Sequence, residues 1–145
     1  MVNFPNPILG LGSSGRECDL ISPVNDLPDT DSLERLRRRL AEFANDRDWQ
    51  QFHSPKNLSM ALIAEAAELV EHFQWLSEAQ SLSLDDRKRS QVRLELADIL
   101  IYLIRTADQL GIDLIAAAND KIAINDERYP VEKVKGKAGR ADDFR

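Results

Sequence analysis

Two stretches of sequence decide the fold, Leu58-Ser-Met-Ala-Leu-Ile-Ala-Glu-Ala-Ala-Glu-Leu-Val70 and Leu94-Glu-Leu-Ala-Asp-Ile-Leu-Ile-Tyr-Leu-Ile104. Both are apolar nearly all round when placed on a helix, which is typical of helices at the centre of a bundle. The main interruptions are acidic residues three positions apart, namely Glu65 and Glu68 in the first stretch and Glu95 and Asp98 in the second. The sequence therefore predicts two central helices that each carry a pair of carboxylates.

Start and stop signals place these two helices among four. Ser54 is suited to cap a helix that begins with Pro55. Gly111 favours the end of the next central helix, and Pro130 prevents the last helix from continuing beyond it. The apolar periodicity and these signals predict helices over about 31–47, 55–76, 85–110 and 114–128. Four helices with short links predict an all-α fold, a four-helix bundle.

Proline and glycine separate this helical region from both ends of the chain. Residues 1–29 are rich in both and predict an extended or flexible N-terminal arm. Residues 30–130 form the predicted helical domain. Residues 131–145 are polar and contain two glycines, so we expect a flexible C-terminal tail.

Composition restricts the partners of the protein. The 25 acidic and 19 basic residues give a net charge of −6, which repels phosphates, so nucleic acids and membrane surfaces are not expected partners. No apolar run reaches the roughly 18 residues of a membrane span. Cys18 is the single cysteine, which rules out an intrachain disulfide. With no secretory signal at the N-terminus, we expect a cytoplasmic protein.

The four carboxylates form a candidate metal site. Residues three positions apart share a helix face, and burying several like charges is costly unless basic partners or a metal compensate. Lys and Arg are absent from the apolar runs around them. Oxygen ligands suit Mg²⁺, with Mn²⁺ as a substitute. The alternative is a pair of solvated helix faces in a non-enzymatic assembly. A di-iron centre is not expected, because neither His53 nor His72 follows an acidic residue by three positions.

Two further groups are candidates for substrate binding. Lys121, Asn125 and Arg128 form one polar stripe of a helix that is able to hold phosphate oxygens, unless it is simply a solvated face. Aromatic side chains are able to stack on a nucleotide base, and His53 offers a polar contact, although core packing is the alternative for the aromatic residues. The aromatic candidates are Trp49, Trp75 and Tyr102.

Several motifs resemble those of the MazG-like superfamily of all-α nucleotide pyrophosphohydrolases. Glu-x-x-Glu at 65–68 with Glu-x-x-Asp at 95–98 is the superfamily pattern. The aromatic residues and His53 are similar to its dCTP pyrophosphatase branch. The stretches that carry the resemblance are Ala41-Glu-Phe-Ala-Asn-Asp-Arg-Asp-Trp49, Phe52-His-Ser-Pro-Lys-Asn57, Ala64-Glu-Ala-Ala-Glu-Leu69, Phe73-Gln-Trp75, Glu95-Leu-Ala-Asp-Ile-Leu-Ile-Tyr102 and Lys121-x-x-x-Asn125-x-x-Arg128-Tyr-Pro130.

The resemblance implies that residues 30–130 form the catalytic domain of a nucleoside triphosphate diphosphatase. The expected substrate is dCTP or 5-modified dCTP, which is split into the monophosphate and pyrophosphate; dUTP or damaged nucleotides are the alternative. Glu65, Glu68, Glu95 and Asp98 would bind Mg²⁺, and Glu65 or Glu68 would act as the catalytic base. Trp49, His53, Trp75 and Tyr102 would line the nucleotide pocket, and Lys121, Asn125 and Arg128 would hold the phosphates. A homo-oligomer is implied as well, a dimer or a tetramer with pockets near the subunit contacts.

Overall fold

Helices dominate residues 32–144, the part of the chain that the computed structural model describes. No strand occurs in this range, which confirms the predicted all-α class. The predicted N-terminal arm, residues 1–29, and Cys18 lie outside the described residues. None of the helices in the described range combines the length and the apolar character that a membrane span requires.

The four predicted helices are present. They are α1 (Ser32–Asn45), α2 (Pro55–Glu71), α4 (Asp86–Leu110) and α5 (Leu114–Arg128). Four shorter elements lie between and after them: η1 (Trp49–Phe52), α3 (Glu78–Ser81), α6 (Val131–Val134) and η2 (Ala141–Phe144). Helix α2 ends five residues before the predicted boundary, because the amides of Phe73 and Gln74 both bond to the carbonyl of Val70 and close a turn. The predicted C-terminal tail contains α6 and η2.

The ends of the long helices are fixed by short polar side chains and one glycine. Ser54 accepts a hydrogen bond from the amide of Asn57 and caps α2. Asp85 caps α4 in the same way, and Asp113 caps α5. Gly111 ends α4 with φ of 64°, a left-handed conformation that a residue without Cβ adopts at little cost. These boundaries follow directly from the sequence.

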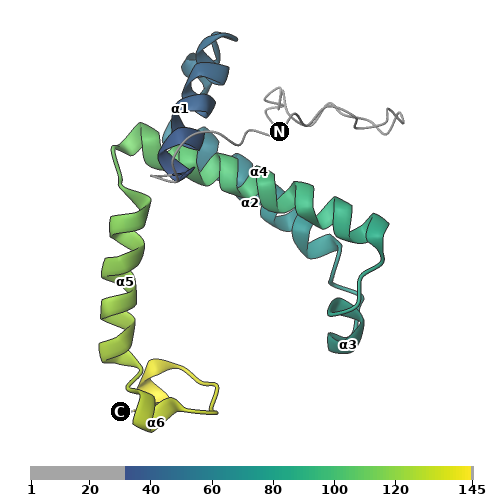
Figure 1. Cartoon of the computed structure of the whole chain (residues 1–145), viewed down its shortest axis with the longest axis vertical. Helices are drawn as coiled ribbons and strands as arrows, with labels where there is room; N and C mark the ends of the chain where they lie inside the picture. The colour runs from purple at the N-terminus through teal and green to yellow at the C-terminus, as the bar shows by residue number, and fades with distance from the viewer. Residues whose placement is uncertain (1–31, 145) are drawn as a thin grey trace.

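Helices α2 and α4 lie side by side along most of the length of α2 and form the centre of the fold (Figure 1). Helix α1 packs against the C-terminal half of α4. The buried apolar residues come from these three helices and are Ala44, Leu58, Val92, Tyr102, Ile104 and Ala107. This core is small for a chain that carries so many apolar side chains.

Helix α5 projects away from the α2–α4 pair after the turn at 111–113 (Figure 1), and none of its residues is buried. A single chain therefore does not close the four-helix bundle within the described residues. Many large apolar side chains stay exposed on α2, α4 and α5. They include Met60, Ile63, Val70, Leu94, Leu96, Leu100, Leu103, Ile115, Ile122 and Ile124.

Candidate active site

Three carboxylates meet where α2 faces α4. One oxygen each of Glu65, Glu95 and Asp98 lies within 4.8 Å of the other two. Glu65 is 2% exposed, and the other two side chains are partly buried. Two oxygens bound to one Mg²⁺ are at most about 4.2 Å apart. A small rotation of the carboxylates would therefore let all three oxygens reach a single ion of this size.

The electrostatics of this cluster favour a cation. Burial, and then the negative charge of Glu95, raise the pKa of Asp98 above its usual value. The ionised form of Asp98 is thus destabilised by its surroundings, as expected for carboxylates gathered in a poorly solvated place. Bound metal would remove this cost, and the all-oxygen ligand set is the one that Mg²⁺ prefers.

Glu68, the fourth predicted ligand, lies one turn from Glu65 on α2 and is partly buried, but it is not one of the three clustered residues. Its role as a ligand stays a prediction. His72 was missed as a neighbour of the centre: its Nε2 lies 3.7 Å from Oε1 of Glu95, which is too long for a hydrogen bond. The signal was its position seven residues after Glu65, on the same helix face.

The charge repulsion in the cluster gives a stability prediction. The pKa of Asp98 is raised in the folded chain, so folding loses stability as pH rises through that folded pKa. Asp98→Asn should therefore raise the urea midpoint of the metal-free protein at pH 7, while Asp120→Asn, on exposed α5, should not change it. Urea unfolding in EDTA measures both. A lower midpoint for Asp98→Asn would show that Asp98 stabilises the metal-free fold.

A small cavity lies one helical turn from the carboxylates. Tyr102 follows Asp98 by four residues on α4 and faces this cavity, which has a volume of about 170 Å³. Trp49 and His53 from the region of η1 form part of the same wall, so three of the four predicted pocket residues are brought together. The other lining residues are Leu40, Phe43, Ala44, Ile101 and Arg105.

The cavity wall is aromatic on the side of η1. The rings of Phe43 and Trp49 meet edge to face with centroids 5.7 Å apart, and the Trp49 and His53 rings are 6.4 Å apart. Burial, and then the positive charge of Arg105, lower the pKa of His53. These surroundings favour the neutral form of His53.

The other predicted site residues lie elsewhere in the single chain. Trp75 follows the end of α2 and is 86% exposed, outside the aromatic cavity. Lys121 and Arg128 are exposed on α5, and Asn125 is partly buried there. Because α5 projects away from α2 and α4, this stripe does not meet the carboxylates of its own chain (Figure 1).

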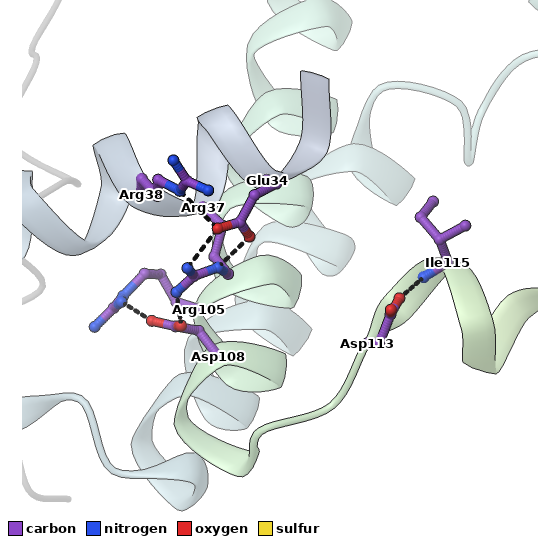
Figure 2. A network of polar contacts seen from close by, with 7 residues as sticks. All are labelled: Glu34, Arg37, Arg38, Arg105, Asp108, Asp113 and Ile115. Atoms are coloured by element: carbon purple, nitrogen blue, oxygen red, sulfur yellow. Dashed lines mark hydrogen bonds and ion pairs between the residues drawn. The ribbon is translucent and has the colours of Figure 1, made fainter. Parts of the chain in front are cut away.

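Beside the cavity lies a network of charged residues that the sequence reasoning did not identify (Figure 2). Arg105 is 2% exposed and donates to Asp108 at 2.5 Å and to the side-chain oxygen of Gln50 at 3.1 Å. Arg37 donates to the other oxygen of Asp108 at 2.5 Å and also pairs with Glu34. The available signal was an arginine that directly follows the apolar stretch 94–104 and precedes Asp108 by three positions, because a buried charge requires a partner.

Comparisons with known proteins agree with this architecture. The MazG-like family model matches residues 61–144. The chain is 39% identical to rat dCTP pyrophosphatase 1 over 135 residues, which is 92% of this chain and 79% of that protein. It is 42% identical to the mouse protein of the same name over 115 residues, 78% of this chain and 68% of that one. The crystal structure of a pyrophosphatase from Archaeoglobus fulgidus covers 70% of this chain and 94% of its own, with a TM-score of 0.66 and 37% identity.

The fold and the acidic centre define an all-α protein in which two central helices bring together three carboxylates that could hold a metal ion. The chain belongs to the MazG-like family.

Proposed function

We propose that this protein is a Mg²⁺-dependent pyrophosphohydrolase that splits dCTP or a 5-modified dCTP into the monophosphate and pyrophosphate. The observation that carries the proposal is the carboxylate cluster of Glu65, Glu95 and Asp98 beside an aromatic cavity on the same helix. The relatives named dCTP pyrophosphatase 1 support both the reaction and the base. A non-enzymatic helical assembly would have no reason to bury Glu65.

The carboxylates hold the metal in this proposal. Glu65, Glu95 and Asp98, with Glu68 as a fourth ligand, would bind Mg²⁺, which when bound supplies positive charge to the triphosphate and to the pyrophosphate leaving group. Once the other ligands hold the metal, either Glu65 or Glu68 would accept the proton of the water that attacks the α-phosphorus. The water oxygen ends in the monophosphate, and the electron pair of the broken bond leaves with pyrophosphate.

The aromatic cavity is large enough for a pyrimidine ring. A cavity of about 150 Å³ in another protein holds one benzene molecule. The cavity of about 170 Å³ therefore has room for one six-membered ring. In the proposal, Trp49 stacks on that ring, and His53 and Tyr102 contact its edge.

A substrate screen tests the base assignment. Pyrophosphate release is measured with Mg²⁺ for the four deoxynucleoside triphosphates, for dUTP, and for 5-methyl-dCTP. We expect dCTP and its 5-substituted form to have the highest kcat/KM. If a purine nucleotide were the best substrate, the base assignment would be wrong and the pyrophosphohydrolase assignment would stand. A preference for dUTP would support the broader hydrolase that the sequence left open.

The phosphate-binding stripe requires a second copy of the chain. Lys121, Asn125 and Arg128 are on α5, away from the carboxylates of their own chain. We propose that a neighbouring copy brings its α5 to the site. The exposed apolar residues on α2, α4 and α5 support this arrangement, because soluble monomers seldom leave large apolar patches open to water.

The expected assembly is a homodimer or homotetramer. Static light scattering at micromolar concentration should give two or four times the chain mass of 16.4 kDa. Ile122→Asp, on the exposed face of α5, should shift the distribution toward the monomer and reduce activity, because it places a charge in the proposed contact. A stable monomer that retains full pyrophosphohydrolase activity would contradict the shared site.

A further inference from the structure

The polar network of Figure 2 lies next to the aromatic cavity, because Arg105 belongs to the network and also lines the cavity. It runs from Glu34 and Arg37 on α1 through Asp108 and Arg105 on α4, and it continues to Gln50 in η1. Gln50 directly follows Trp49, which forms part of the cavity wall. The network therefore connects three elements that surround the cavity.

We propose that Arg105 is a positioning residue for base recognition, because it holds η1 through Gln50 and thereby fixes the ring of Trp49 against the cavity. The proposal rests on the proposed function in one respect, that this cavity receives the base. It assigns to Arg105, Gln50, Asp108 and Arg37 a role in substrate affinity, without contact between these four residues and the reacting atoms.

The turn η1 has few bonds within itself. It contains four residues, its N-cap Asp48 has φ of 53°, and no side chain caps it. A non-glycine residue with positive φ carries a conformational cost. The side-chain amide of Gln51 donates to the backbone carbonyl and to the carboxylate of Asp48, so these bonds stay within the turn and its N-cap. Bonds to other helices hold the two ends of the turn. The side-chain amide of Asn57 on α2 donates to the carbonyl of Phe52, and Arg105 on α4 donates to Gln50, the residue next to Trp49.

The burial of Arg105 favours positioning over stability. Its Nε is buried and has no hydrogen-bond partner among residues 32–144. An unsatisfied buried donor is costly, and a buried ion pair is often no more stabilising than apolar residues of the same volume. The guanidinium instead fixes the orientation of Gln50, because one terminal nitrogen donates to Asp108 and the other donates to Gln50. Arg37 holds the second oxygen of Asp108, which fixes the carboxylate in turn.

The test compares substitutions of two neighbouring glutamines. Gln50→Leu removes the acceptor for Arg105, Gln50→Glu retains it, and Gln51→Leu removes a bond within the same turn without affecting α4. We expect Gln50→Leu to raise KM for the best nucleotide about tenfold, or about 1.4 kcal/mol, with kcat and the Mg²⁺ dependence unchanged, because positioning acts on binding in the ground and transition states alike. Gln50→Glu should keep the wild-type KM, and Gln51→Leu should change KM less than Gln50→Leu.

A second readout needs no substrate. The chain has two tryptophans, so Trp75→Phe leaves Trp49 as the single fluorescent reporter. In that background, Gln50→Leu should make Trp49 more accessible to acrylamide, and Gln50→Glu should not. Wild-type quenching and KM in Gln50→Leu, or an equal effect of Gln51→Leu on both, would overturn the positioning role. If no nucleotide is hydrolysed, the quenching result still decides whether Arg105 positions Trp49, and the proposed function fails separately.

Discussion

Glu65→Gln is expected to reduce Mg²⁺-dependent hydrolysis by about a thousandfold, with the helical fold intact. Glu65 is the most buried of the three clustered carboxylates, and its oxygen lies within 4.8 Å of those of Glu95 and Asp98. Metal ions stabilise transition-state charge by several kcal/mol, and each 1.36 kcal/mol changes the rate tenfold. Removal of this ligand should therefore abolish nearly all activity at any substrate concentration. Steady-state pyrophosphate release measures the rate, and circular dichroism checks the fold.

The other proposed ligands should behave in the same way. Glu68→Gln, Glu95→Gln and Asp98→Asn are each expected to abolish activity, and isothermal titration should show weaker Mg²⁺ binding. Glu71→Gln is the matched control, since Glu71 is exposed at the end of the same helix. If any two of the four ligand substitutions kept wild-type activity, the metal assignment would be wrong.

Trp49→Ala should lower kcat/KM for the preferred nucleotide by roughly ten- to a hundredfold. Stacking on a base contributes about 1–3 kcal/mol per aromatic residue, and 1.4 kcal/mol corresponds to a factor of ten. Mg²⁺ affinity should not change, because Trp49 lines the cavity and is not one of the clustered carboxylates. Equal kcat/KM for wild type and Trp49→Ala would remove the stacking role.

Trp75→Ala is the informative comparison. Trp75 is 86% exposed in the single chain, so a pocket built by one chain alone predicts no effect. The same loss as for Trp49→Ala would instead indicate that a second copy brings Trp75 to the nucleotide.

Helix boundaries were predictable because they depend on neighbouring residues. Ser54 with Pro55 fixes the start of α2, and Gly111 fixes the end of α4. The carboxylate cluster was predictable for a related reason, since residues three positions apart share a helix face and two such faces are buried together. The spacing of residues along each helix was thus sufficient to predict the carboxylate cluster of the candidate site.

Features that depend on tertiary placement were not predictable. The end of α2 at Glu71 results from a turn that its apolar pattern does not reveal. The direction of α5 is set by the link at 111–113. The polar stripe on α5 could therefore be recognised from the sequence, but the distance of that stripe from the carboxylates could not. The contact of Arg105 with Gln50 joins residues 55 positions apart, and helical periodicity contains no information on such a pair.

Analysis of the products formed from dCTP tests the central claim most directly. The protein is incubated with dCTP and Mg²⁺ in H₂¹⁸O, the products are separated, and the mass of each product is measured by mass spectrometry. We expect dCMP and pyrophosphate in equal amounts, with the label in dCMP, and no turnover in EDTA or with Glu65→Gln. Formation of dCDP and phosphate, or turnover that continues without a divalent metal, would contradict it.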